Sequence, residues 1–188
     1  MLIIGHRGAG DLGPENTLQA LRKGIECADF VEVDLRLTKD GIPVAIHDAS
    51  LDRTTDGAGP VKSYTIEELK RLDAGEGESI PALYEVLKLI RDSGSGLVAE
   101  IKEPGTEAII VSVLMDQMPG RLILTSAYPD SVAMAKRLLP GVQAGLIYSE
   151  RSDDLIKTAH QSRADVIFLR LDQVSHEVVE QIKEAGLL

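Results

Sequence analysis

The sequence of 188 residues contains one cysteine, no tryptophan and no long apolar run. Cys27 alone cannot form an intramolecular disulfide, so we expect a fold without covalent cross-links in a reducing compartment. No segment reaches the roughly 20 consecutive apolar residues that cross a bilayer, and the amino terminus has no basic leader. The sequence therefore predicts a cytoplasmic protein without stable membrane association.

Basic charge is also scarce. Lysine and arginine total 20, aspartate and glutamate total 30, and the formal net charge is −10. A protein that binds nucleic acid or an anionic membrane needs a basic face, so both partner classes are excluded. The hydrophobic content of 44% and charged content of 27% are typical of a globular protein. We expect one domain over residues 1–188 and a small-molecule partner.

Strand-like and helix-like patterns alternate along most of the chain, which indicates an α/β fold around a parallel sheet. The predicted strands are residues 2–4, 30–35, 43–47, 97–102, 121–126, 142–147 and 165–170. The predicted helices are residues 14–28, 82–92, 106–117, 130–138, 152–162 and 175–185. Seven strands are one short of a closed eight-stranded barrel, and the final EAGLL reads as the start of a further strand. An open sheet edge favours self-association, so we expect either a homo-oligomer or a chain that belongs to a longer parent.

Two connections in the first half are unusual. Residues 49–79 are rich in Gly, Asp, Thr and Ser, with one short helical segment, TIEELKRL, and few apolar residues. We interpret them as a small insertion over the mouth of a site. Between the second and third strands, Asp40-Gly41 is a hairpin signal that competes with an irregular parallel crossover. A hairpin would place Glu32 opposite His47.

Ionisable residues gather at or near the ends of the predicted strands. Glu32 and Asp34 share one face of a strand because side chains alternate with period two, and Glu100 and Lys102 do the same on another strand. Carboxyl ends of neighbouring parallel strands converge, as at the active sites of α/β barrels. The candidate site residues are His6, Arg7, Glu32, Asp34, His47, Glu100 and Lys102.

Several linked motifs carry a resemblance to a known family. In order they are HRG, PENT, EVDLRLTKDG, PVAIHD, LDRTTDGAG, IPALYEVL and AEIKEP, from residue 3 to about 104. Together they resemble the glycerophosphodiester phosphodiesterases. The resemblance implies a TIM (β/α)8-type barrel, here lacking its closing carboxyl-terminal strands. It also implies an enzyme that hydrolyses glycerophosphodiesters to glycerol 3-phosphate and an alcohol.

The resemblance further implies a role for each candidate residue. His6 and His47 are the general acid/base pair, and Arg7 and Lys102 contact the substrate phosphate. Glu32, Asp34 and Glu100 bind one divalent cation, Ca²⁺ or Mg²⁺. The chemistry is consistent, because a hard cation relieves the repulsion among carboxylates and, with two cationic side chains, offsets the phosphodiester anion. Imidazoles with a pKa near 6.5 suit proton transfer at neutral pH.

Alternatives remain open at this stage. Thr125, Ser126, Ala127 and Tyr128 replace a Ser-Ser-Phe found in many family members, and the family's closing tryptophan-containing segment is absent. A lysophospholipase D-like activity and a catalytically silent metal- or partner-binding module are therefore competing readings. In an alternative interpretation, Arg7 and Lys102 only form ion pairs with carboxylates and do not contact the phosphate. Glu15 and Asn16 read as supporting or helix-start residues, and Asp48, Asp52 and Arg53 as loop structure.

Overall fold

Strands and helices alternate through a chain that divides into two units, residues 1–122 and 123–188. The structure, a computed structural model, describes residues 2–149 and 154–188. None of the described helices combines the length and apolar character needed to cross a membrane. The candidate site residues all have numbers below 122, so they belong to the first unit. They lie on two strands of this unit, β2 (Phe30–Leu37) and β4 (Gly96–Ile101), and on the segments that follow its strands.

The sheet of the first unit is centred on β2 (Phe30–Leu37). This strand pairs in parallel with β1 (Ile4–Gly5) and β4 (Gly96–Ile101), and antiparallel with β3 (Pro43–Ala45). Every residue from Phe30 to Leu35 is buried, the two carboxylates included. β2 runs two residues further than predicted, so these carboxylates lie within the strand.

The connection between β2 and β3 is a hairpin. Leu35 pairs with Ala45, and Gly41 in the turn has φ of 78°. The hairpin reading of Asp40-Gly41 is thus confirmed and the parallel crossover was wrong. The predicted pairing of Glu32 with His47 was also wrong, because the ladder ends at Ala45, before the chain reaches His47.

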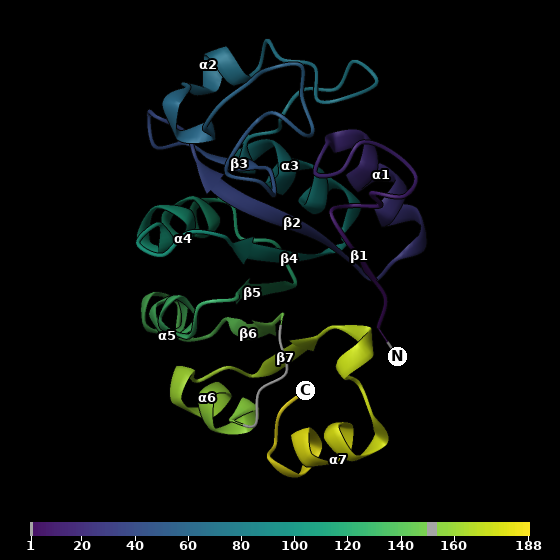
Figure 1. The fold of residues 1–188 in the computed structure, drawn as a ribbon, viewed down its shortest axis with the longest axis vertical. Coiled ribbons are helices and arrows are strands. Elements are labelled where there is room, and N and C mark those ends of the chain that lie inside the picture. Colours follow the sequence, from purple (N-terminus) through teal and green to yellow (C-terminus); the bar gives the residue numbers. More distant parts are fainter. Residues whose placement is uncertain (1, 150–153) are drawn as a thin grey trace. The chain divides into compact units, whose positions relative to one another are not determined.

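Four α-helices accompany this sheet: α1 (Leu18–Cys27), α2 (Ile66–Leu69), α3 (Leu83–Ser93) and α4 (Glu107–Asp116). Helix α1 packs against β1, β2 and α3 (Figure 1). It begins at Leu18, four residues later than predicted, because Asn16 has φ of 60°, which no right-handed helix accepts. The side chain of Thr17 instead caps the helix by accepting a hydrogen bond from the Ala20 N–H.

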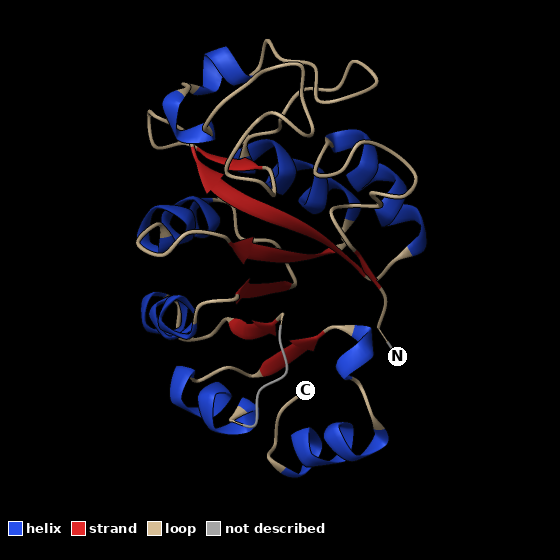
Figure 2. Cartoon of the chain, in the orientation of Figure 1, coloured by secondary structure: helices blue, strands red, loops and turns tan. Residues whose placement is uncertain are grey.

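Residues 49–79 are drawn mainly as loops, which precede the 3₁₀ helix Val61–Ser63 and follow α2 (Figure 2). The few apolar residues here do not build a separate core. They share one cluster with side chains from and beside β3, consisting of Val44, Ile46, Leu51, Val61, Leu69, Ala74 and Ile80. The insertion is therefore packed onto the chain segment that carries His47.

The second unit contains β5 (Leu122–Ser126), whose first residue ends the first unit, β6 (Gln143–Tyr148) and β7 (Val166–Leu169). Helices α5 (Pro129–Leu138), α6 (Leu155–Ser162) and α7 (His176–Glu184) alternate with them. The strands are parallel, in the order β5-β6-β7. Helix α6 was predicted from residue 152, and residues 152 and 153 lie outside the described part. Of the segment EAGLL, Glu184 still belongs to α7, and Leu188 exchanges backbone hydrogen bonds with Asp165 and Ile167, so only the end of this segment lies beside β7.

Helix α4 offers a test of the packing. Leu114 is fully buried, whereas its neighbour Met115 is 58% exposed. We expect Leu114→Ala to lower the free energy of unfolding by about 2–5 kcal/mol, because it removes buried methyl groups and leaves a cavity. Met115→Ala should change it by less than about 0.5 kcal/mol. Urea denaturation of both variants measures this, and equal losses would contradict the placement of α4.

Candidate active site

Three carboxylates meet on one face of the first unit's sheet. Parallel pairing of β2 with β4 places Asp34 beside Glu100, and Glu32 lies two residues earlier on the same face. One carboxylate oxygen from each residue lies within 4.8 Å of the other two. Glu32 and Asp34 are 7% and 1% exposed, and the Glu100 side chain 13%. The structure thus brings together the three residues predicted to bind a cation.

Burial and neighbouring negative charges raise the pKa of two of these carboxylates, Glu32 and Glu100. Burial, and then the charges of Asp34 and Glu100, raise the pKa of Glu32 to about 8, although the Arg7 N–H donates to its carboxylate over 2.8 Å. Burial also raises the pKa of Glu100, against the hydrogen bond from Lys102. Glu32 Oε1 and Asp34 Oδ1 are buried and accept no hydrogen bond from the described residues. Oxygen ligands of this kind fit a hard divalent cation.

The loop between β1 and α1 is fixed around Asp34. The Asn16 side chain donates to Asp34 Oδ2 over 2.8 Å, and its carbonyl oxygen accepts the Asp34 N–H over 3.0 Å. Arg7 and Asn16 both have positive φ, 52° and 60°, and the Asn16 N–H donates to the Arg7 carbonyl. A Cβ on Gly8 would lie 2.6 Å from backbone atoms of α1, so this loop needs glycine there. Such strained backbone next to ionisable groups is typical of functional sites.

Arg7 and Lys102 both contact the carboxylate group. Lys102 Nζ lies 2.8 Å from Glu100 Oε1 and 3.3 Å from Asp34 Oδ1. Arg7 Nε lies 3.4 Å from Asp34 Oδ2, and its Nη1 lies 2.8 Å from Glu15 Oε1. The alternative reading, in which both pair with carboxylates, therefore describes the structure. Their contact with a substrate phosphate stays a prediction.

The two histidines approach this group from different segments. His6 follows β1 directly, and desolvation and the Arg7 charge lower its pKa, partly offset by Asp34 and Glu15. A charged His47 would make the smallest contribution to the lowered pKa of His6. His47 is about one third exposed, and its Nδ1 lies 2.6 Å from Asp48 Oδ1.

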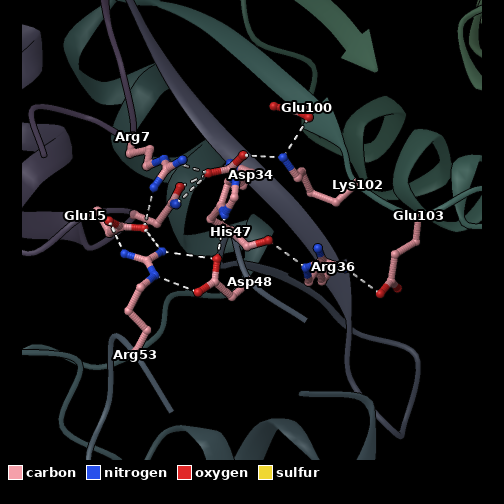
Figure 3. A network of polar contacts seen from close by, with 11 residues as sticks. Arg7, Glu15, Asp34, Arg36, His47, Asp48, Arg53, Glu100, Lys102 and Glu103 are labelled. Carbon is pink, nitrogen blue, oxygen red and sulfur yellow. Dashed lines mark hydrogen bonds and ion pairs between the residues drawn. The ribbon is translucent and has the colours of Figure 1, made fainter. Parts of the chain in front are cut away.

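A chain of polar contacts joins these elements. Figure 3 shows Asp34 between Arg7 and Lys102, and Arg53 between the carboxylates of Glu15 and Asp48. The hydrogen bond from Arg53, and then that of His47, hold the pKa of Asp48 well below its usual range. Arg53 and then Arg7 likewise lower the pKa of Glu15. The network extends from the carboxylate group into the 49–79 insertion.

A model of the glycerophosphoryl diester phosphodiesterase family matches residues 6–188. The chain belongs to this family. It is 41% identical over 161 residues to the glycerophosphodiester phosphodiesterase of Caldanaerobacter subterraneus. The aligned region covers 78% of this chain and 66% of that protein. It is 36% identical over 160 residues to the Bacillus altitudinis enzyme, covering 77% and 65%. The chain thus spans about two thirds of the length of these relatives.

Solved structures of family members resemble the whole chain. One is a phosphodiesterase from Oleispira antarctica in complex with the product sn-glycerol-3-phosphate, with a TM-score of 0.93 and 32% identity. The aligned region covers 100% of this chain and 82% of the Oleispira antarctica chain. The glycerophosphodiester phosphodiesterase from Thermotoga maritima gives a TM-score of 0.83 at 27% identity. The predicted fold class, a TIM (β/α)8-type barrel lacking its closing strands, is confirmed by this likeness to longer family members.

Several residues of the network were assigned no function from sequence. Asn16 was read as a supporting or helix-start residue, and its two hydrogen bonds to Asp34 show the former. Asp48 and Arg53 were interpreted as loop structure. In the structure Asp48 contacts His47, and Arg53 contacts both Asp48 and Glu15. The position of Asp48 directly after His47 was a usable signal. Arg53 gave none, because its partner Glu15 is 38 residues away. Asp52, by contrast, bonds only within the loop.

The raised pKa of Glu32 predicts how stability depends on pH. In the unfolded chain this carboxyl ionises near pH 4.5, whereas in the folded metal-free protein it stays protonated to about pH 8. Between these pH values the folded state therefore holds one more proton than the unfolded state. The contribution of Glu32 to the free energy of unfolding falls by about 1.4 kcal/mol per pH unit as the pH rises. Urea denaturation with a chelator at pH 5 and pH 8 measures this loss.

Glu32→Gln should flatten that pH dependence, because glutamine cannot ionise. Glu26→Gln, on the exposed face of α1, is the matched control and should leave it unchanged. If Glu32→Gln loses as much stability between pH 5 and pH 8 as the wild-type protein does, the assignment of the extra proton to Glu32 is wrong.

Proposed function

We propose that this protein hydrolyses glycerophosphodiesters to glycerol 3-phosphate and an alcohol, with one divalent cation, Ca²⁺ or Mg²⁺. The observation that carries the proposal is the buried group of Glu32, Asp34 and Glu100, with ligand oxygens within 4.8 Å of one another. Family membership supports the reaction class, and a relative with the same fold holds sn-glycerol-3-phosphate. The competing reading as a silent module predicts metal binding without turnover.

The charges of the group match this substrate. Three carboxylates against Arg7 and Lys102 leave one net negative charge when all are ionised. A divalent cation held by Glu32, Asp34 and Glu100 would turn that into one net positive charge, the complement of a phosphodiester anion. When bound, the cation would supply Lewis-acid stabilisation of negative charge on the phosphoryl oxygens. Without it, burial and then the charge of Asp34 raise the pKa of Glu32.

Arg7 and Lys102 then orient the phosphate. They reach Asp34 from opposite sides, from the loop after β1 and from the residue after β4 (Figure 3). Both side chains are mostly buried, with 19% and 15% exposed, so their charges act in a poorly solvated setting. A phosphate placed at the carboxylate group would meet a cationic side chain on each side.

The histidines divide the proton transfers. One removes a proton from the attacking hydroxyl or water, and the other protonates the leaving alkoxide. Partial desolvation lowers the pKa of His6, which favours its neutral form near pH 7. Neutral His47 can donate its Nδ1 proton to Asp48, which leaves Nε2 as the reactive nitrogen.

The central test is release of glycerol 3-phosphate from glycerophosphocholine, glycerophosphoethanolamine and glycerophosphoglycerol. We expect turnover with Ca²⁺ or Mg²⁺ and none after chelation. His6→Ala and His47→Ala should each lower kcat by about 10²- to 10⁴-fold, because each removes one proton transfer. Glu32→Gln should weaken cation binding in calorimetry.

His160→Ala is the matched control, because His160 is exposed on α6 in the second unit and should retain wild-type kcat. Undiminished turnover in either His6→Ala or His47→Ala would remove the acid/base assignment. Cation binding without hydrolysis of any diester would favour the silent module.

A second candidate, lysophospholipase D-like hydrolysis, is favoured by one observation. A cavity of about 550 Å³ beside His6 and Arg7 is lined in part by Ile4, Ala9 and Leu12. Leu12 is 60% exposed. Ile4 belongs to β1, and Ala9 and Leu12 lie in the loop before α1. An acyl chain would therefore be received here and not by the 49–79 insertion, which is predicted to lie over the mouth of the site.

Comparison of a lysolipid with glycerophosphocholine decides between the two candidates. If the apolar wall is used, Leu12→Ser should lower kcat/KM for the lysolipid by about tenfold and leave the soluble diester unaffected, because a buried leucine side chain contributes roughly 1.5–3 kcal/mol. Equal effects on both substrates, or no lysolipid turnover, would reject this candidate.

A further inference from the structure

The backbone on both sides of His47 is held firmly. Ile46 before it and Leu51 after it are both buried in the cluster shared with the insertion. The carbonyl oxygen of His47 accepts a hydrogen bond from Arg36 Nε over 2.8 Å, and Arg36 is itself held by Glu103 at 2.6 Å. The main chain at His47 is thus fixed independently of its imidazole.

The imidazole itself depends on one side chain. Asp48 Oδ1, 2.6 Å from His47 Nδ1, is the only hydrogen-bond partner of this ring in the described part of the chain. Asp48 is about 30% exposed and lies at the start of a loop, so its own carboxylate needs a support. Arg53 provides one, with Nε 2.6 Å from Oδ2 and Nη2 3.2 Å from Oδ1.

Arg53 is anchored on its other side as well. Its Nη1 and Nη2 donate to the two oxygens of Glu15 over 2.9 and 2.7 Å. One guanidinium from the insertion therefore makes four hydrogen bonds to two carboxylates, that of Glu15 in the loop before α1 and that of Asp48 next to His47 (Figure 3). Only a planar fork with five N–H groups can do this, and lysine cannot.

We infer that Arg53 is a positioning residue for the proposed reaction: it fixes Asp48, and through Asp48 the orientation and proton position of the His47 imidazole. The inference rests on the proposed function for its catalytic meaning. With the proton of neutral His47 on Nδ1 and donated to Asp48, Nε2 is held free for proton transfer. Once Asp48 loses its support, the ring rotates and the two neutral tautomers mix.

Loss of Arg53 could also affect the reaction by a route that does not involve His47. Glu15 also contacts Arg7, so loss of Arg53 could act through Arg7 and the substrate phosphate. That route weakens substrate binding and raises KM, whereas misplacement of His47 lowers kcat. Glu15→Gln removes the charged partner of Arg7 and keeps both contacts of Arg53 with Asp48, so it reports mainly on the competing route.

The experiment compares Arg53→Gln, Asp48→Asn and Glu15→Gln in the full chain. We expect Arg53→Gln and Asp48→Asn to lower kcat by about 10- to 100-fold with KM within about twofold of wild type. Glu15→Gln should act mainly on KM. Arg71→Gln is the matched control, an exposed arginine of the same insertion, and should match the wild type. Thermal unfolding followed by circular dichroism checks that each variant is folded, and Asp48→Asn, nearly isosteric, guards against loss of folding in Arg53→Gln.

Nitrogen-15 NMR of the His47 ring supplies a readout independent of activity. The wild-type protein should show one neutral tautomer of His47, protonated on Nδ1. Arg53→Gln and Asp48→Asn should each show a mixture of the two neutral tautomers. Unchanged His47 signals in Arg53→Gln, a raised KM with unchanged kcat, or an equal loss in Arg71→Gln would each overturn the inference. If the wild-type protein hydrolyses no diester, the proposed function fails, while the NMR result still decides whether Arg53 positions His47.

Discussion

The crowding of three buried carboxylates is the constraint on which the rest of the first unit depends. Asp34 lies beside Glu100 because β2 and β4 are parallel and in that register, and Glu32 joins them on the same face. Buried like charges are costly unless they are paired, hydrogen-bonded or bound to a metal. Arg7, Lys102 and Asn16 supply part of that compensation, and Glu32 Oε1 and Asp34 Oδ1 accept no hydrogen bond within the described part of the chain.

The compensation explains local features that otherwise look arbitrary. Arg7 adopts a left-handed backbone conformation and can then donate its N–H to Glu32 while its side chain reaches Glu15. Helix α1 starts late because Asn16, also left-handed, is used to hold Asp34. From Glu15 the network continues through Arg53 to the insertion, so a loop-rich segment is tied to the group by charged contacts and to β3 by apolar packing.

Element types were predictable because hydrophobic periodicity and turn residues act locally. The Asp40-Gly41 turn and most helix and strand positions follow from patterns within about ten residues. The errors came where nonlocal contacts override local preference. The sequence favoured helix from Pro14, a good first-turn residue, but the hydrogen bonds of Asn16 to a strand 18 residues away decide its conformation. The hairpin error has another origin: the turn was predicted correctly, but β3 ends at Ala45 and the ladder does not reach His47.

The sequence by itself determined which chemical groups are available and on which face of each strand they stand, because side-chain alternation and motif spacing are local properties. It was sufficient for the family, the α/β class and the carboxylate and histidine candidates. Only the tertiary structure decided which side chains touch. The pairing of Arg53 with Glu15 and Asp48, and of Arg36 with the His47 carbonyl, depends on how distant loops pack. Long flexible side chains find such partners in three dimensions, and sequence spacing carries no record of them.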